Sequence, residues 1–371
     1  MDGNSVKGNR LMSLDAFRGF DMLWIMGGED LICAIAALLG IAGFGEVFGH
    51  VPWEGLHFMD TVFPTFIFMA GVSFPFSAAK SLARGMTRRE IALKALRRGI
   101  TLILLGIIYG GFLRTLRFTS FRIMSVLGYI GFGWMVASWI YLYVRNVKAR
   151  IGVALGILAA VTLVFGLIPA PDAAADAVKF SPEWHLGCWL DRTILGRHAL
   201  TPTFDNEGFG GLFCTVVTAM LGMFAGEIVR GSGTKATGRK ALGLLACAVV
   251  CLVSGLALST FYPIIKNLWS PSFVLVVGSY SFAMFALFYW IIDVKGWSKW
   301  CFFFQVIGLN SITIYIAQRF ITFNKAQYFF LGGVEDMLPH AWGQVVARLG
   351  YIAACWLFLY FLYRKNVFLK V

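Results

Sequence analysis

Two ionisable side chains, His50 and Asp60, stand at the start of an apolar stretch that is hydrophobic enough to enter a bilayer. A carboxylate inside a membrane segment costs about 2.5–3.5 kcal/mol on insertion scales, so Asp60 is expected to have a partner or a task. Imidazole titrates near pH 6.5 and can take and return a proton at neutral pH. Asp60 could orient the ring by accepting from one of its nitrogens, as in a catalytic triad. The pair predicts general-base catalysis by His50, and a solvated or packed histidine is the alternative.

The other histidines have less suitable neighbours. His57, three residues before Asp60, is the local competitor for the same role. His185, His198 and His340 lie outside the apolar segments without comparable acidic company. We therefore expect these three to be solvated or packed.

Five further charged residues lie where apolar segments begin or end: Glu29, Asp30, Arg122, Asp205 and Glu207. If the fold brings these boundaries to one membrane face, their charges form an enclosed polar site with His50 and Asp60. The alternative is that they are solvated loop residues close to the membrane. Trp53, Trp184 and Trp189 could stack on a sugar ring there, although interfacial tryptophans are common in membrane proteins.

The stretch SLDAFRGFDMLW places Asp15, Arg18 and Asp21 on one face of a helix, so Arg18 can pair with either carboxylate. Two interpretations are open: an ion pair that eases insertion, or a polar track that leads inward from the cytoplasm. Asn310, in IGLNSITIYIAQ, falls within an apolar segment, where it could make a packing hydrogen bond or a ligand contact.

Composition identifies the environment that must position these residues. The 371-residue chain is 58% hydrophobic and only 14% charged, whereas soluble domains carry about a quarter charged residues. We predict an all-α, polytopic integral membrane protein with one transmembrane domain over 1–371. The seven cysteines form no C-x-x-C pair, which favours buried free thiols over a disulfide framework or a metal site.

A spanning helix needs about 20 mainly apolar residues. About ten candidate spans lie near 12–28, 56–79, 96–113, 123–144, 151–169, 209–229, 241–262, 271–293, 300–321 and 343–363. A shorter apolar piece, 31–44, is predicted to be re-entrant or a weak extra span. The paired glycines Gly106/Gly110 and Gly222/Gly226 allow close helix contact, either within the chain or in a homodimer.

The net charge of +13 does not indicate nucleic-acid binding, because the basic residues cluster in every second short loop. This is the positive-inside pattern, and it predicts that both termini are cytoplasmic. The clusters are Lys7 and Arg10; Lys80, Arg84, Arg88, Arg89, Lys94, Arg97 and Arg98; Arg145, Lys148 and Arg150; Arg230, Lys235, Arg239 and Lys240; Lys295 and Lys299; and Arg364, Lys365 and Lys370. The opposite face then carries the loops near 29–55, 114–122, 170–208, 263–270 and 322–342.

Several motifs occur in an order typical of one family: SLDAFRGF, HVPWEGLHFMDTVFPTFIFMAGVS, FDNEGFGGLFCTVVTAMLGMFAGEI, FALFYWIIDVKGW and IGLNSITIYIAQ. The chain resembles the transmembrane N-acetyltransferase family of heparan-α-glucosaminide N-acetyltransferase and its bacterial relatives. The resemblance covers nearly the whole chain, and the block H-x-x-W-x-G-L-x-x-x-D-x-x-F-P is its most specific part. It implies transfer of acetyl from cytoplasmic acetyl-CoA to the amino group of a glucosamine across the membrane.

The resemblance also implies roles for individual residues. The family's active-site histidine matches His50, and the aspartate of the same block matches Asp60. Other family motifs match the following residues: Asp15, Arg18, Arg122, Asp205, Glu207, Asn310 and Ser311. The chain departs from the animal enzyme at Glu29, Gly128, Tyr129 and Gln318, and these departures bear on the identity of the acceptor.

The sequence thus predicts a bacterial plasma-membrane acetyltransferase. His50 acts as general base or forms an acetyl-imidazole, with Asp60 beside it. The acceptor site consists of Glu29, Trp53, Arg122, Asp205 and Glu207. Acetyl-CoA is held by Asp15, Arg18, Asn310 and Ser311, and the neighbouring Arg97 and Arg98 either contact its phosphates or serve only the topology. The alternative function is a sugar transporter, against which the sequence shows no evident inverted repeat and no paired broken helices.

Overall fold

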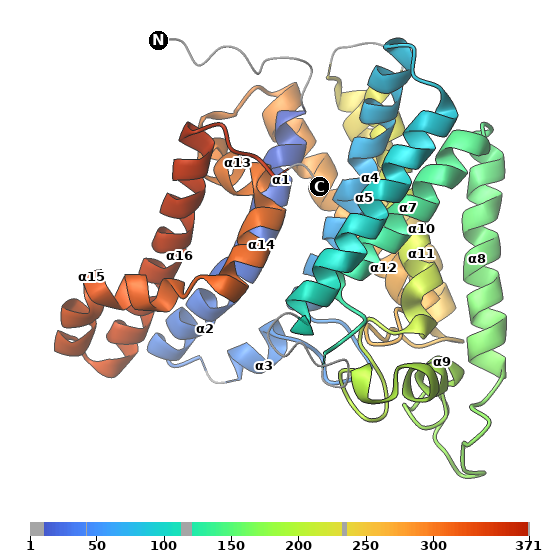
Figure 1. Cartoon of the computed structure of the whole chain (residues 1–371), viewed down its shortest axis with the longest axis horizontal. Helices are drawn as coiled ribbons and strands as arrows, with labels where there is room; N and C mark the ends of the chain where they lie inside the picture. Colours follow the sequence, from blue (N-terminus) through green and yellow to red (C-terminus); the bar gives the residue numbers. More distant parts are fainter. Residues whose placement is uncertain (1–10, 42, 113–120, 232–235, 370–371) are drawn as a thin grey trace. The chain divides into compact units, whose positions relative to one another are not determined.

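The computed structural model describes residues 11–41, 43–112, 121–231 and 236–369 (Figure 1). These residues form helices and no β-strand, apart from the isolated bridges Glu54–Ile265 and Pro169–His185, which confirms the all-α prediction. They fall into two compact units. The first unit comprises the described residues of 1–45, 235–244 and 283–370, and the second comprises those of 46–234 and 245–282. The organisation of 1–371 as one transmembrane domain stays a prediction.

The first unit contains these helices: α1 (Met12–Leu23), η1 (Trp24–Gly28), α2 (Glu29–Leu38), η4 (Tyr289–Val294), η5 (Lys299–Cys301), α13 (Phe302–Leu309), α14 (Ser311–Phe320), α15 (Phe323–Met337) and α16 (His340–Arg364). The second unit contains α4 (Phe58–Ala83), α5 (Arg88–Tyr109), α7 (Val126–Tyr143), α8 (Val147–Leu167), α9 (Leu186–Leu190), η2 (Asp191–Leu195), η3 (Gly196–His198) and α10 (Phe209–Arg230). Three helices contribute residues to both units: α3 (Phe44–Phe48), α11 (Gly238–Ser259) and α12 (Pro271–Phe288).

Among the described residues, seven helices, or eight with one bent pair, are long and apolar enough to cross a bilayer. They are α4, α7, α8, α10, α11, α12 with η4, and α16, with α13 and α14 as the bent pair. The chain is therefore a multi-pass membrane protein. The predicted spans at 12–28 and 96–113 do not qualify on these grounds, because α1 has only 12 residues and α5 begins with a basic segment. The count of ten and the cytoplasmic termini stay predictions.

Two helices of the first unit are interrupted. α1 continues into α2 through the π-helical stretch η1, where Gly27 adopts a positive φ of 107°. The bend between α13 and α14 is 58° and lies at Asn310. The structure thus corrects two expectations. The piece 31–44 is mostly the continuation of the first helix, and broken helices are present although the sequence had not indicated them.

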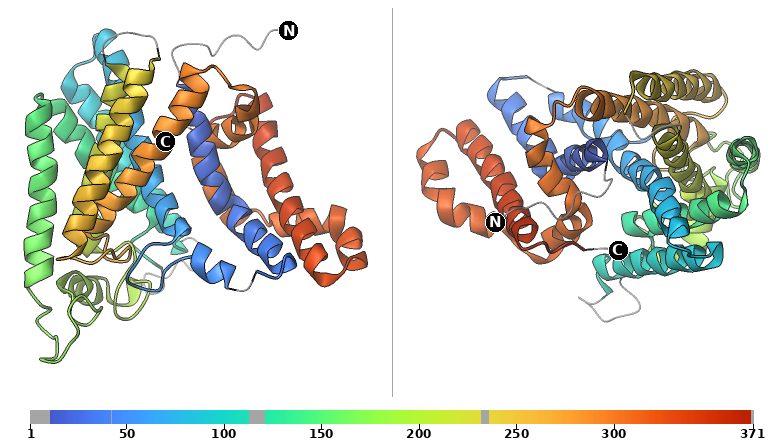
Figure 2. Two further views of the ribbon diagram at one scale, coloured as in Figure 1. Left: turned by 180° about the vertical axis from the view of Figure 1, so that it is seen from behind. Right: turned by 90° about the horizontal axis from the view of Figure 1, so that it is seen from above.

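In the second unit, α4, α5, α7 and α10 pack side by side (Figures 1 and 2). Gly222 and Gly226 of α10 lie so close to α4 that a Cβ on either would overlap its backbone oxygens. Gly106 of α5 and its C-cap residue Gly110 lie equally close to the segment before α7, where a Cβ would overlap the Ser125 hydroxyl and the Arg122 carbonyl oxygen respectively. Both glycine pairs therefore serve packing within the chain. The homodimer stays a prediction.

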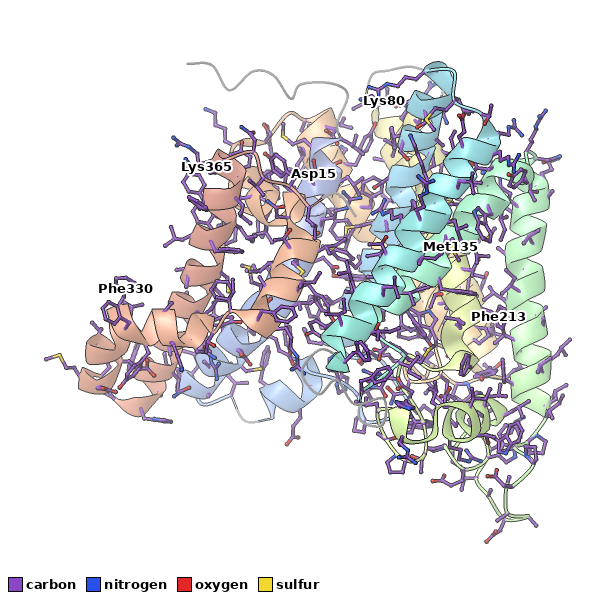
Figure 3. The ribbon with its side chains drawn as sticks, in the orientation of Figure 1. Asp15, Lys80, Met135, Phe213, Phe330 and Lys365 are labelled. Carbon is purple, nitrogen blue, oxygen red and sulfur yellow. The ribbon has the colours of Figure 1, made fainter. Side chains whose placement is uncertain are left out.

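α4, α7 and α10 run in the same direction and end at a basic pole of the second unit. Arg230, at the end of α10, has its Nη1 3.5 Å from the carbonyl oxygen of Pro75 on α4. Arg150, near the start of α8, pairs its Nη2 with Glu227 on α10 at 2.8 Å. Lys80 projects at the same end of α4 (Figure 3). This gathering of basic residues supports the predicted cytoplasmic side.

The prediction that the basic segment at 80–98 is a loop was wrong, because α4 continues to Ala83 and α5 begins at Arg88. The side chain of Thr87 caps α5 by accepting from the backbone N–H of Glu90 at 3.2 Å, and this cap fixes the start of the helix. Arg97 and Arg98 are consequently helical residues. Lys7, Arg10, Lys235 and Lys370 of the charge pattern lie outside the described residues.

Candidate active site

The pole of the second unit opposite the basic one is where α4, α7 and α10 begin. His50 precedes α4, Arg122 precedes α7, and Asp205 and Glu207 precede α10. The loop 263–270, which precedes α12, joins them at this pole through contacts described below. Helix N-termini carry partial positive charge, so the three helix starts at this pole stabilise the negative charge of the carboxylates that lie there.

His50 and Asp60 are in contact, as predicted. The Nδ1 atom of His50 lies 2.8 Å from Oδ1 of Asp60. The Asp60 side chain is fully buried, whereas the His50 side chain is 54% exposed. A buried carboxylate therefore holds one nitrogen of a ring that remains accessible.

Asp60 is itself fixed by the backbone. Its Oδ2 accepts from the N–H of Val51 at 3.2 Å and from the N–H of His57 at 3.0 Å. His57 is the N-cap residue of α4 and Asp60 is in the first turn, so this carboxylate also caps the helix. The Asp60 carboxylate therefore lies in the first turn of α4 with hydrogen-bond partners, and it is not an unpaired charge in the middle of the apolar helix.

Lys266 is a third member of this group that the sequence analysis did not identify. Its Nζ lies 3.0 Å from Oδ1 of Asp60 and 2.8 Å from Nδ1 of His50. Its side chain is only 17% exposed. The sequence carried one signal for Lys266: a lysine in a short loop that the charge pattern predicts to be extracytoplasmic runs against that pattern.

The loop that carries Lys266 is pinned to the segment that carries His50. The N–H of Gly55 donates to the carbonyl of Ile264 at 2.8 Å, next to the bridge between Glu54 and Ile265. The amide of Asn267 donates to the carbonyl of Pro52 at 3.3 Å. These contacts, one between backbones and one from the Asn267 side chain, set the register that places Lys266 opposite His50.

Arg122, Asp205 and Glu207 form a second cluster, as predicted. The Nε of Arg122 donates to Oδ2 of Asp205 at 3.0 Å, and its Nη2 bonds to both carboxylates. Burial opposes the charge on Arg122, but hydrogen bonds to Asp205 and the nearby Glu207 raise the pKa of its guanidinium above the ordinary value. Arg122 is held as a permanent cation between two acids.

Glu207 belongs to the Arg122 cluster and also lies within electrostatic range of Lys266. Burial raises its pKa, and the positive charges of Arg122 and Lys266 act in the opposite direction. Lys266 therefore lies close enough to influence Glu207 as well as Asp60. The structure joins His50, Asp60, Lys266, Glu207 and Arg122 in one polar region of the second unit.

Asp191 supports this region from the 170–208 loop, and the sequence analysis had not identified it. Its carboxylate accepts from the N–H of Asp205 at 3.2 Å and from that of Phe209 at 2.7 Å. A Cβ on Gly208 would overlap this carboxylate, so only glycine fits there. Burial raises the pKa of Asp191 to about 7.

Trp53 lies beside the site and is half-buried. Its Nε1 donates to the carbonyl of Phe180 at 3.0 Å, and its ring meets Phe204 edge-on at a centroid distance of 5.0 Å. These contacts tie the His50 segment to the 170–208 loop. Its role in stacking on a sugar stays a prediction.

Two of the remaining histidines are packed, as expected. His185 is fully buried, with its Nε2 2.6 Å from the hydroxyl of Tyr262, and burial lowers its pKa to about 3. The Nδ1 of His198 lies 2.7 Å from the carbonyl of Phe121. His340 is exposed at the first position of α16.

Several predicted residues lie in the first unit. Glu29 begins α2, and its neighbour Asp30 pairs with Arg348 at 3.1 Å. Asp15 and Arg18 pair at 3.6 Å, as the spacing predicted. Figure 3 shows Asp15 on α1.

Asn310 and Ser311 are buried at the break between α13 and α14. The Nδ2 of Asn310 donates to the carbonyl of Val367 at 3.1 Å, and its Oδ1 accepts from Thr313 at 3.3 Å. The packing interpretation of Asn310 is thus confirmed, and a ligand contact stays a prediction.

Arg97 and Arg98 differ in their surroundings. The guanidinium of Arg98 lies over the ring of Trp134, 4.4 Å from its centroid, whereas Arg97 is exposed. Arg98 therefore has a packing role, and Arg97 is the better candidate for a phosphate contact.

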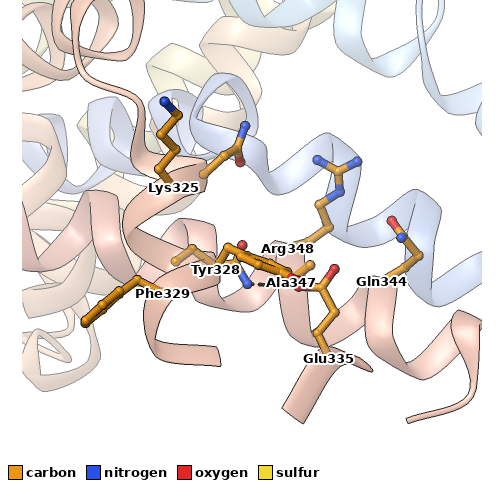
Figure 4. Close-up of a pocket in the computed structure, with 9 residues that line it drawn as sticks. Lys325, Tyr328, Phe329, Glu335, Gln344, Ala347 and Arg348 are labelled. Carbon is orange, nitrogen blue, oxygen red and sulfur yellow. Dashed lines mark hydrogen bonds between the residues drawn. The ribbon is translucent and has the colours of Figure 1, made fainter. Parts of the chain in front are cut away.

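A cavity of about 600 Å³ in the first unit involves none of the predicted site residues. It lies between α15 and α16 and is lined by Lys325, Tyr328, Glu335, Gln344 and Arg348 among others (Figure 4). A hydrogen bond of 3.2 Å from Gln327 to Glu335 crosses one side of it.

Comparisons with known proteins support the reading of the motifs. The chain is 28% identical, over an alignment of 434 positions, to the human protein named heparan-alpha-glucosaminide N-acetyltransferase. It is 27% identical, over an alignment of 422 positions, to the mouse protein of that name. The predicted resemblance is confirmed. The alignments cover 98% of this chain but only 60% and 61% of the two relatives, so the chain spans about three-fifths of their length. No protein-family model matches the chain.

Proposed function

We propose that this chain is a transmembrane acetyltransferase that moves acetyl from cytoplasmic acetyl-CoA to the amino group of an extracytoplasmic amino sugar. The observation that carries the proposal is the contact of 2.8 Å between a buried Asp60 and an accessible His50. The names of the human and mouse relatives support the reaction class.

The contact between His50 and Asp60 suits His50 to act as a general base. If Nδ1–H of His50 donates to Asp60, the other nitrogen, Nε2, carries the lone pair. An amine attacks a thioester carbonyl only when its nitrogen is uncharged. His50 Nε2 removes one proton from the ammonium group, and the uncharged amine attacks the thioester carbonyl. The C–N bond forms and the C–S bond breaks, the nitrogen gives its second proton to the leaving CoA thiolate, and His50 releases the first proton to solvent.

A second route uses the same His50, acetyl-CoA and acceptor amine but proceeds in two steps. His50 Nε2 attacks the thioester carbonyl, and an acetyl-imidazole forms as CoA thiolate leaves. The acceptor amine then takes the acetyl group and the imidazole is regenerated. Trapping of acetylated protein by rapid quenching in the absence of acceptor distinguishes this route from direct transfer.

The acceptor site is proposed to be the polar region beside His50. Asp205, Glu207 and Arg122 supply acceptors and a donor for sugar hydroxyls, and Trp53 supplies an aromatic face. Glu29, a residue of the first unit, stays a predicted acceptor contact. The acids also attract the ammonium form of an amino sugar. The proposed donor contacts are Asp15, Arg18, Asn310, Ser311, Arg97 and Arg98.

The decisive experiment uses vesicles that contain the purified protein. Acetyl-CoA is sealed inside and glucosamine is supplied outside, and external N-acetylglucosamine is measured. We expect product with the wild type and at least about a 10²-fold lower rate with His50→Ala, because general bases contribute at least that much. His340→Ala is the matched control, since that histidine is exposed on another helix. A His50→Ala variant that keeps more than a tenth of the rate would exclude the role.

The broken helices favour one other candidate, a sugar transporter. Discontinuous helices at Gly27 and Asn310 are the kind of element that transporters use at their binding sites. In the same vesicles, uptake of labelled glucosamine without acetyl-CoA would support transport. External acetylation that depends on internal acetyl-CoA, without such uptake, would exclude it.

We also propose a bacterial plasma membrane location with both termini in the cytoplasm. The basic pole of the second unit supports this orientation, because Arg150 and Arg230 gather there. Labelling of single cysteines from outside should reach the His50 segment and not the turn between α4 and α5.

A further inference from the structure

The proposed function assigns no role to Lys266, although this lysine contacts both His50 and Asp60. Its Nζ, the Nδ1 of His50 and the Oδ1 of Asp60 form a triangle with sides of 2.8, 2.8 and 3.0 Å. Two of the three groups can carry positive charge, and one carries negative charge. The charge state of the imidazole therefore depends on both neighbours.

The triangle admits two arrangements of protons. If Nδ1 accepts from Lys266, its lone pair also faces the carboxylate oxygen of Asp60 at 2.8 Å, and two acceptors repel at that distance. If Nδ1–H and Lys266 both donate to Oδ1, the two donors Nδ1 and Nζ face each other at 2.8 Å instead. Only the second arrangement leaves Nε2 of His50 with the lone pair that the proposed base requires.

Lys266 also changes the cost of protonating that lone pair. A carboxylate alone beside an imidazole favours the imidazolium, whereas a cation in contact with the ring disfavours it. Lys266 already balances the charge of Asp60, so Asp60 can orient the ring without holding it in the charged form. The other acids of the segment before α4, Glu46 and Glu54, are exposed, and the charge of Lys266 also acts to lower the pKa of Glu207 before α10.

We infer that Lys266 is a positioning residue that keeps His50 uncharged with Nδ1–H directed to Asp60, so that Nε2 is available as the base. The loop contacts support this role. The bonds from Gly55 to Ile264 and from Asn267 to Pro52 hold the Lys266 loop against the His50 segment. This inference deepens the proposed function, on which it rests for the use of His50 as a base.

The test measures His50 directly and does not depend on turnover. Diethyl pyrocarbonate reacts with the uncharged imidazole, and its rate at the His50 peptide is followed by mass spectrometry from pH 5 to 9. In Lys266→Met, which removes the cation at similar size, we expect the pH at half-maximal rate to rise by about one unit. Lys266→Arg keeps the cation and should restore the wild-type profile. Lys325→Met, a lysine on α15, is the matched control.

The acetyl-transfer rate is measured on the same proteins. Its acid limb should move upward in Lys266→Met by the same amount and should return with Lys266→Arg. If the Lys266→Met protein does not insert into the membrane, Lys266→Gln serves as the second neutral variant. Superimposable modification profiles for the wild type and a folded neutral variant would overturn the inference. A shifted modification profile with no acetyl transfer by any protein would leave the inference standing and reject the proposed function.

Discussion

Replacing Asp60 by asparagine is the sharpest test of the candidate active site, because this change alters charge and proton position with little change in shape. Oδ1 of Asp60 accepts from His50 at 2.8 Å and from Lys266 at 3.0 Å. Oδ2 accepts from the backbone N–H groups of Val51 and His57. An asparagine must use its single oxygen on one of these two sides.

The backbone N–H groups can only donate, so the asparagine oxygen is expected to face them. Its NH2 group then faces Nδ1 of His50, which must become the acceptor. The ring proton moves to Nε2 and the lone pair needed for base catalysis is lost. In serine proteases the equivalent substitution lowers kcat by about 10⁴-fold. We expect a decrease of about 10²- to 10⁴-fold here.

Stability should fall as well, because Lys266 loses its carboxylate partner while only 17% exposed. Removing one member of a buried ion pair costs about 3–5 kcal/mol, and the residual exposure of Lys266 and its nearness to Glu207 reduce this to about 2–3 kcal/mol. Asp60→Ala also removes the helix cap and should cost about 1 kcal/mol more.

The assay combines kcat for acetyl transfer with thermal unfolding in detergent. Glu54→Gln is the matched control, since it neutralises an exposed acid of the same segment. An Asp60→Asn protein that melts like the wild type and retains more than a tenth of kcat would refute the proposed hydrogen-bond pattern.

Arg122→Ala should lower the free energy of unfolding by about 3–5 kcal/mol, because it leaves two buried carboxylates without their cation; chemical denaturation measures this, and a loss below about 1 kcal/mol would contradict it. Gly208→Ala should prevent stable folding, because its Cβ would overlap the Asp191 carboxylate, whereas Gly152→Ala on α8, with open space around it, should be neutral or stabilising by about 0.5–1 kcal/mol. The raised pKa of Asp191, about 7 when folded against 3.8 ordinarily, means that the folded state binds the extra proton. The stabilisation from Asp191 is therefore complete below about pH 4 and is lost as pH rises through about 7, so melting temperature should fall across this range in the wild type. Asp191→Asn should show a smaller fall, and an equal fall would contradict the assignment.

The sequence by itself determined the class of protein and the pairing of His50 with Asp60. Membrane residence follows from composition, because a chain with 58% hydrophobic residues and 14% charged residues cannot cover its apolar segments with polar surface. The pairing followed from local chemistry, because a carboxylate at the start of a span needs a partner and a histidine stood nearby. The ion pair of Asp15 and Arg18 was readable for the same reason, since helix geometry fixes contacts between residues three apart.

Only the tertiary structure decided which residues complete the site. Lys266 is 206 positions from Asp60 and reaches it because backbone bonds align the loop 263–270 with the segment 50–57. Asp191 is likewise selected by the path of a long loop whose backbone donors its carboxylate accepts. The breaks at Gly27 and Asn310 also escaped prediction, because an apolar sequence specifies burial along its length without specifying where the backbone turns. Contacts between distant segments depend on the register of packed helices and loops, and no local spacing in the sequence encodes that register.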